Sequence, residues 1–162
     1  MADAPLDPST RPRLLEVAET TLAVVHGLVS PAMIRDFFDT SFTRLATVLA
    51  NQDVSISGPA LACYGATSEQ TMQIAVGFPV DRQIVPEDEV VADRLPAGPT
   101  ARLVHHGSFD ELGASWDRLY SWITDRGLTP GDNRWEVYVT EPNPQMDPAD
   151  LRTELNWPVA PV

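Results

Sequence analysis

Hydrophobic and polar positions along this chain follow two different periods, and each change of period marks the start of a new predicted element. Apolar residues recur every three or four positions over 30–51 and again over 108–127, which is the spacing of an amphipathic helix. Ser108 and Glu111 have the spacing of a capping box, which predicts where the second helix starts. The sequence therefore predicts two helices, one in each half of the chain.

Short runs rich in β-branched and apolar residues fill most of the remaining chain, and such runs are typical of β-strands. Turn signals built on glycine and proline separate them. Because each half then has the order strand, helix, strand, strand, the pattern predicts an α+β fold with a mainly antiparallel sheet and the helices on one face. The strand-like runs cover residues 14–25, 60–66, 71–80, 90–95, 100–106, 133–140 and 151–157.

A single domain is expected over residues 13–162, preceded by a flexible tail over 1–12. The tail contains three prolines and few apolar residues. A mixed-charge segment over 81–88 is expected to connect the two halves, and the proline-rich segment 141–148 is expected to form a turn. Because so short a tail has no room for a helix-turn-helix, the domain is expected to act without a DNA-binding domain of its own.

The two halves of the chain are weakly similar to each other. Residues 40–64 can be laid over 114–138 without a gap, and most apolar positions then stay in phase. A repeat that occurs twice favours two modules related by a pseudo-two-fold axis over a solenoid, which needs at least three units. The modules would extend over about 13–80 and 90–159, with a ligand cleft between them.

One acidic residue distinguishes the second copy from the first. In the overlay Ala62 falls on Glu136, and Tyr64 falls on Tyr138. Because side chains along a strand alternate between the faces of a sheet, Glu136 shares a face with Tyr138, and Ala62 shares the matching face with Tyr64. These four side chains point into the cleft if the helices cover the opposite face.

Glu136 is therefore the centre of a predicted binding site. A carboxylate among aromatic walls favours a cationic ligand, because the cation offsets the lost hydration of the carboxylate and gains cation–π attraction. The alternative is that Glu136 lies in water at a strand edge or pairs with Arg134 or Arg152. The helices are expected on the other face of the sheet. They would pack there against Leu61, Cys63, Trp135 and Val137.

Composition and charge narrow the classes of partner. The chain has 11 basic and 23 acidic residues, a net charge of −12, and every basic residue is an arginine. This balance argues against direct nucleic-acid binding, which needs clustered positive charge, and the lack of lysine excludes Schiff-base chemistry. With Cys63 as the only cysteine and no apolar run long enough to span a membrane, a cytoplasmic protein is expected.

No cofactor and no metal are predicted. His105 and His106 are adjacent on a predicted strand and so point to opposite faces, and His26 has no partner at ligand spacing. The sequence also contains no glycine-rich phosphate loop and no G-x-S-x-G nucleophile motif. The expected partner is therefore a small molecule that side chains alone recognise, and the oligomeric state is left open.

Six short motifs follow one another in the second half of the chain. They are His106-Gly107-Ser108-Phe109, Trp122-Ile123, Trp135-Glu136-Val137-Tyr138, Asp147-Pro148, Thr153-Glu154 and Trp157-Pro158-Val159. In this order they resemble the GyrI-like (gyrase-inhibitor-like) effector-binding domains, and the resemblance extends over roughly 14–159. It implies two strand-helix-strand-strand modules about a pseudo-dyad, with a cleft that binds lipophilic, often cationic compounds and contains the acid at the position of Glu136.

Residues and resemblance together predict a stand-alone small-molecule-binding protein. It would capture a lipophilic, cationic or polycyclic compound, for sequestration, sensing or self-resistance to an antibiotic. The predicted ligand-binding residues are Glu136, Tyr138, Tyr64, Ala62 and Trp157.

Two other functions stay open beside this primary prediction. The resemblance implies a hydrolase of strained, cyclopropane-bearing natural products as one of them, with Glu136 as the general base and Tyr138 or Tyr64 as the polarising acid. The acidic surface supports the other, a protein-interaction module that acts on a topoisomerase or on a separate regulator.

Overall fold

The computed structural model describes residues 11–161 of the chain apart from 68–70, 141–144 and 146. Residues 1–10 of the predicted tail and most of the predicted proline-rich turn therefore lie outside the described residues. In chain order the elements are β1 (Arg13–Val17), β2 (Thr20–Val29), η2 (Pro31–Met33), α1 (Ile34–Asn51), β3 (Leu61–Thr67), β4 (Met72–Pro79), β5 (Val90–Leu95), β6 (Gly98–His106), η3 (Phe109–Glu111), α2 (Leu112–Asp125), β7 (Leu128–Pro130), β8 (Arg134–Tyr138), η4 (Pro148–Asp150) and β9 (Arg152–Pro161), where η marks a 3-10 turn.

The strands form one sheet of antiparallel pairs, and with the two helices they confirm the predicted α+β class. The sheet has nine strands in the order β1-β6-β9-β8-β3-β4-β2-β5, with β7 paired to β9. The single strand predicted over 14–25 is two strands. The chain leaves the sheet at Ala18 and Glu19, because β1 pairs with β6 whereas β2 pairs with β4 and β5.

The strand order is equivalent when it is read outward in either direction from the central β3–β8 pair. On one side of the pair come β4, β2 and β5, and on the other side come β9, β6 and β1. In each direction the first strand follows the central one in the chain, the second precedes the helix, and the third is the outer strand. Ala62 pairs with Glu136 across β3 and β8. The two residues that the overlay matches are thus neighbours in the sheet, and the pseudo-two-fold axis itself stays a prediction.

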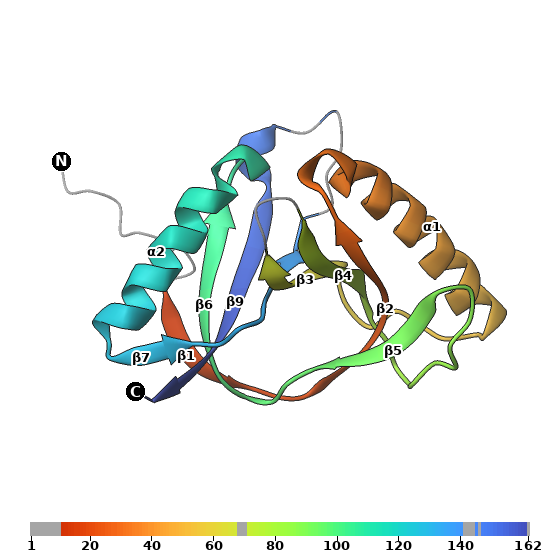
Figure 1. Ribbon diagram of the computed structural model, residues 1–162, viewed down its shortest axis with the longest axis horizontal. Coiled ribbons are helices and arrows are strands. Elements are labelled where there is room, and N and C mark those ends of the chain that lie inside the picture. Colours follow the sequence, from red (N-terminus) through yellow and green to blue (C-terminus); the bar gives the residue numbers. More distant parts are fainter. Residues whose placement is uncertain (1–10, 68–70, 141–144, 146, 162) are drawn as a thin grey trace.

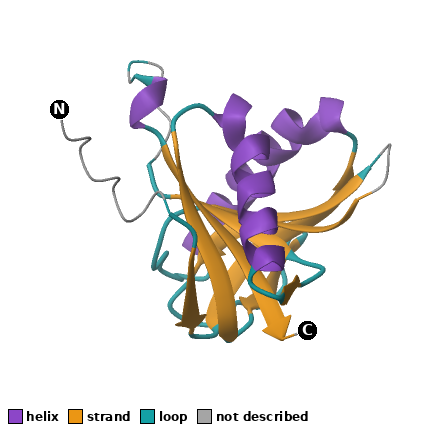
Figure 2. Ribbon diagram, turned by 90° about the vertical axis from the view of Figure 1, so that its left-hand side faces the viewer, coloured by secondary structure: helices purple, strands orange, loops and turns teal. Residues whose placement is uncertain are grey.

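Both helices lie on the same face of the sheet, above its two ends (Figures 1 and 2). Leu45 of α1 forms a buried cluster with Ala23 of β2, and Leu119 of α2 forms another with Leu103 of β6. Because each helix covers the outer strands of one half, the central strands β3 and β8 lie between the helices in Figure 1.

The prediction of which face the helices cover was wrong. Ala62 and Ile74 form a cluster with Phe38 and Phe42 of α1, so the face that carries Ala62 and Glu136 is the face under the helices. The residues expected to meet the helices lie on the other face. The reason is that strands, rather than helices, cover that face.

A second core fills the opposite face of the sheet. β1 leads into β2 and β5 leads into β6, and these two long segments pair antiparallel to each other along the bottom of Figure 1. They close beneath the central strands and bring Leu95 onto the Trp135 side chain. The buried cluster there consists of Leu22, Val24, Leu61, Ala75, Leu95 and Trp135, with Cys63, Val91 and Val137 packed against it.

The start of α2 differs from the predicted capping box. Ser108 caps the 3-10 turn η3, where its hydroxyl accepts a hydrogen bond from the backbone N–H of Asp110 at 3.2 Å. α2 then begins at Leu112, with Glu111 in the N-cap position and no side-chain cap. The capping box was wrong because one 3-10 turn comes between Ser108 and the α-helix.

Candidate functional site

Glu136 lies at the centre of the sheet, on the face between α1 and α2. Its cross-strand neighbours are Ala62 of β3 and Leu155 of β9. Both neighbours are fully buried, and Glu136 itself is only 3% exposed. A carboxylate buried this deeply needs hydrogen bonds that replace those it makes with water.

Two tyrosine hydroxyls supply such hydrogen bonds. Tyr64 Oη and Tyr138 Oη donate to the same carboxylate oxygen, Glu136 Oε1, at 2.5 and 2.7 Å. Burial, and then the neighbouring Glu136 carboxylate, raise the pKa of both phenols well above their usual range, so both hydroxyls stay protonated. The structure thus brings together Glu136, Tyr64, Tyr138 and, across the ladder, Ala62.

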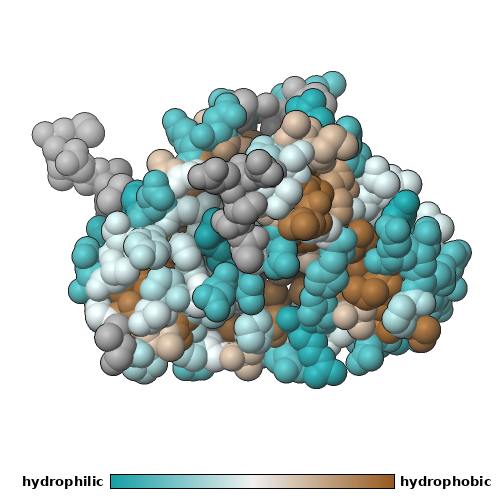
Figure 3. All heavy atoms as spheres, in the orientation of Figure 1, coloured by the Kyte–Doolittle hydropathy of each residue, from teal (hydrophilic) through white to brown (hydrophobic). Residues whose placement is uncertain are grey.

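Aromatic rings from both halves of the chain surround this group. The Tyr138 ring centroid lies 6.3 Å from that of Phe38 in α1 and 6.0 Å from that of Phe109 in η3. Sequence reasoning missed both phenylalanines as site residues, because Phe38 belongs to the apolar stripe of a helix and Phe109 follows the Ser108 cap. Figure 3 shows hydrophobic side chains reaching the surface over the α1 half, whereas pale and hydrophilic ones cover most of the α2 half.

Glu136 forms no ion pair with any described residue. Arg134, two residues earlier on the same face, lies over aromatic rings instead. Arg152 donates to the backbone carbonyls of Ala149 and Leu151, each at 2.9 Å. The alternative that placed Glu136 in water or beside one of these arginines was therefore wrong.

Trp157 lies next to this group rather than inside it. Its ring centroid is 5.6 Å from that of Trp116 in α2, and its indole N–H donates to the Gly131 carbonyl at 2.8 Å. Trp157 is connected to the site through Arg134, whose guanidinium contacts the rings of both Trp157 and Tyr64.

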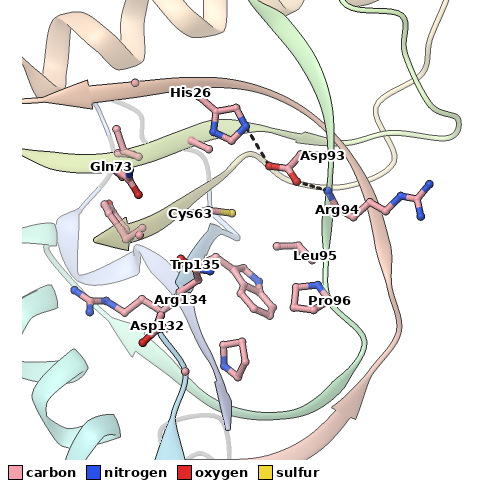
Figure 4. A pocket seen from close by; sticks show the side chains of 18 of the residues that line it. His26, Cys63, Gln73, Asp93, Arg94, Leu95, Pro96, Asp132, Arg134 and Trp135 are labelled. Atoms are coloured by element: carbon pink, nitrogen blue, oxygen red, sulfur yellow. Dashed lines mark hydrogen bonds and ion pairs between the residues drawn. The ribbon is translucent and has the colours of Figure 1, made fainter. Parts of the chain in front are cut away.

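A pocket of about 650 Å³ lies on the opposite face of the sheet (Figure 4). Trp135 and Cys63 line it, together with His26 and Asp93, whose Nε2 and Oδ2 atoms lie 3.2 Å apart. Burial and the Asp93 charge raise the pKa of the Cys63 thiol to about 12, so the thiol is a poor nucleophile. Glu136 is not among the residues that line this pocket, but Tyr64 and Arg134 are. We favour the Glu136 face as the candidate site, because there a buried charge has no ionic partner among the described residues.

We find no metal site in the described part of the chain. No three His, Cys, Asp or Glu side chains there could hold a metal ion together. Buried His105 bonds to Ser115 Oγ and to the Ser108 carbonyl, both at 2.7 Å, and so ties η3 and α2 to β6. Within the same residues, no helix is long and apolar enough to cross a membrane.

Alkaline pH should destabilise the fold through the two phenols of the site. Because their pKa values are raised in the folded state, the unfolded chain loses phenol protons above about pH 10 that the folded chain keeps. The stabilising contribution is therefore full below about pH 10 and falls as the pH rises, by up to about 1.4 kcal/mol per tyrosine and pH unit. Urea unfolding at several alkaline pH values measures this slope. Tyr138→Phe removes one of the two phenols and should lower the slope by up to about 1.4 kcal/mol per pH unit. An unchanged slope would mean that the Tyr138 phenol is not responsible for the alkaline destabilisation.

The sequence of the chain matches the family described as "GyrI-like small molecule binding domain" over residues 10–160. The chain therefore belongs to this family of small-molecule-binding domains. No curated protein matches it.

Solved structures of similar fold include one with DNA and one with a small molecule. The crystal structure of the EcmrR C-terminal domain matches 94% of this chain and 98% of that chain, with a TM-score of 0.82 and 18% identity. In a cryo-EM structure of an EcmrR–DNA complex the TM-score is 0.83 at 18% identity, with 94% of this chain matched but only 58% of the EcmrR chain. This chain thus spans little more than half the length of that protein.

The structure of SAV2435 bound to tetraphenylphosphonium is a further match. It covers 93% of this chain and 94% of that chain, with a TM-score of 0.66 and 13% identity. At these identities the likeness concerns the fold alone.

Proposed function

We propose that this domain captures a lipophilic cation in the space between α1 and α2, with the positive group of the ligand held at Glu136. One observation carries the proposal: a carboxylate that is 3% exposed accepts two tyrosine hydroxyls and meets no cation among the described residues. Tyr64 and Tyr138 stabilise the carboxylate, but they bring no positive charge to it. A ligand cation would supply that charge.

The energetics of burial favour a cation over a neutral ligand. A buried charge without a counter-charge is costly, and a cation that reaches it removes part of that cost. The Tyr138 hydroxyl donates to the carboxylate, and the rings of Phe38 and Phe109 pack against the Tyr138 ring. Each well-placed ring would add cation–π attraction of about 0.5–2 kcal/mol. Because Glu136 is only 3% exposed, the side chains that cover it have to move apart when a ligand enters.

Titration with tetraphenylphosphonium tests this function. The cation bound to SAV2435 is one of the right class, and triphenylphosphine oxide is a neutral molecule of similar shape. Calorimetry should give saturable binding of the cation, with clearly weaker binding of the oxide. Equal affinities would show that charge is not recognised, and no saturable binding of the cation would contradict the proposed function.

The hydrolase alternative rests on the same three residues. Two protonated phenols beside a carboxylate could polarise a strained electrophile while Glu136 activates water. We expect capture without turnover, for sequestration or sensing, and the lone Cys63 fits a reducing cytoplasm as its compartment. Mass spectrometry of a bound cyclopropane-bearing compound decides the question. Recovery of an intact compound supports capture, whereas a product that gained one water supports hydrolysis.

A further inference from the structure

Arg134 carries a second charge on the same face of β8 as Glu136 without a direct ion pair to it, and this charge bears on which cations the site takes. The Arg134 guanidinium carbon lies 5.0 Å from the ring centroid of Trp116, 5.0 Å from that of Trp157 and 5.9 Å from that of Tyr64. Figure 4 shows the Arg134 side chain pointing away from Cys63, and Trp116, one of the rings it contacts, belongs to α2. Arg134 is therefore held among three rings beside α2, and it also lines the pocket of about 650 Å³.

This guanidinium has no counter-charge in the described part of the chain. Arg44, Arg94 and Arg102 each form an ion pair with a glutamate, whereas no such pair is found for Arg134. Its Nε is buried and has no hydrogen-bond partner there. Aromatic rings hold a guanidinium by its faces and leave its edge free for a planar acceptor such as a carboxylate. The arrangement is thus suited to an anionic group that the described residues do not provide.

The two uncompensated charges are placed along one strand. Arg134 and Glu136 are separated by one residue of β8, so they share a face at a spacing of about 6.6 Å along the strand. Tyr64 lies between them, because its hydroxyl donates to Glu136 and its ring lies under the Arg134 guanidinium. The ring keeps the guanidinium and the carboxylate from forming a direct ion pair.

We propose that Arg134 is a specificity-determining residue that makes the site prefer amphoteric ligands, with a cation at Glu136 and a carboxylate or similar anionic group at Arg134. This inference rests on the proposed function of Glu136 and narrows its ligand class. The overall charge of −12 works against it, because long-range attraction favours a purely cationic ligand over a zwitterion. A preference for the zwitterion would therefore have to come from a local group.

Two probes that share one cation test the inference. (4-Carboxybutyl)triphenylphosphonium carries a carboxylate on a chain that spans a distance similar to the Arg134–Glu136 spacing, and its methyl ester lacks the anion. Calorimetric titration should give about tenfold tighter binding of the zwitterion by the wild type, as expected for one charge-assisted hydrogen-bonded pair. Arg134→Gln should abolish that preference while leaving the affinity for the ester similar or higher.

Two further variants control for charge and for folding. Arg126, whose guanidinium carbon lies 4.2 Å from the Trp122 ring centroid at the far end of α2, makes the same kind of contact away from the site. Arg126→Gln should therefore keep the preference of the wild type. Arg134→Lys keeps the positive charge but loses the planar edge of the guanidinium. It should retain only part of the preference for the zwitterion, which gives a readout even if the glutamine variant does not fold.

The outcomes distinguish a failure of the role of Arg134 from a failure of the proposed function of Glu136. Equal binding of both probes by the wild type, or an equal loss of both in Arg134→Gln, overturns the role of Arg134 and leaves Glu136 as the cation site. Failure of the wild type to bind either probe contradicts the proposed function, and the inference fails with it.

Discussion

Replacing Glu136 with glutamine is expected to weaken the binding of tetraphenylphosphonium by about thirtyfold or more. Loss of one partner from a buried charge pair costs about 2–5 kcal/mol, and 1.4 kcal/mol corresponds to a factor of ten in affinity. Glutamine keeps the shape of the side chain and an oxygen that accepts from Tyr64 and Tyr138. The change therefore removes the charge and leaves the hydrogen bonds, and the free energy of unfolding should change by no more than about 1 kcal/mol.

Glu154→Gln is the matched control for this prediction. Glu154 lies on β9, pairs with Val137 across the ladder to β8, and faces the other side of the sheet, where it forms an ion pair of 3.2 Å with Arg102. The Glu154→Gln substitution removes one negative charge from the same region of the fold without touching the site. Calorimetry should give near wild-type affinity for this variant. Equal losses in the two variants would mean that net charge, rather than Glu136, holds the cation.

Of the glycine-to-alanine substitutions in this chain, Gly77→Ala is expected to destabilise the fold most. Gly77 lies in β4 between β2 and β3, opposite Val24 and Leu61. A Cβ at this position would come within 1.9 Å of the backbone oxygen of Ala23. Because backbone in the middle of a sheet cannot move aside without breaking its ladder, the expected loss in the free energy of unfolding is about 3 kcal/mol. Urea unfolding measures it.

Gly113→Ala gives the comparison for that experiment. Gly113 lies in α2, and a Cβ there would meet nothing within 4 Å. Alanine is the better helix former by about 1 kcal/mol, so this variant should be as stable as the wild type or more stable. A Gly77→Ala variant with wild-type stability would show that β2 and β4 are packed less closely than the structure has them.

Periodicity was sufficient to predict the elements that position the site. The three- and four-residue spacing identified both helices, and alternation along the strands correctly put Glu136 and Tyr138 on one face. The overlay of the two halves matched Ala62 with Glu136, and these residues pair across β3 and β8. Such local patterns are predictable because neighbours in the chain and in a ladder follow fixed geometry.

Alternation could not show which face the helices cover. Both faces of the central strands are buried, so Leu61 and Trp135 look as much like partners of a helix as Ala62 does. What covers the lower face is the pairing of β5 with β2 and of β1 with β6, over long distances in the sequence. A single sequence carries no local signal of such pairings, and the face was therefore assigned wrongly.

The aromatic surroundings of the charges were equally hard to foresee. Trp116 and Trp157 come from α2 and β9, yet both contact Arg134. From the sequence, Arg134 was one of two nearby arginines that could have paired with Glu136. The Tyr64 ring from the other half of the chain lies under the guanidinium instead, and this contact depends on the register between β3 and β8.

A crystal structure of the protein grown with tetraphenylphosphonium tests the central claim most directly, because it shows whether the cation reaches the Glu136 carboxylate. We expect the cation between α1 and α2, with its phosphorus atom near the Glu136 carboxylate and its phenyl rings against Tyr138 and Phe38. A cation bound instead in the pocket of about 650 Å³ beside Cys63 and Trp135, with Glu136 still covered, would contradict it.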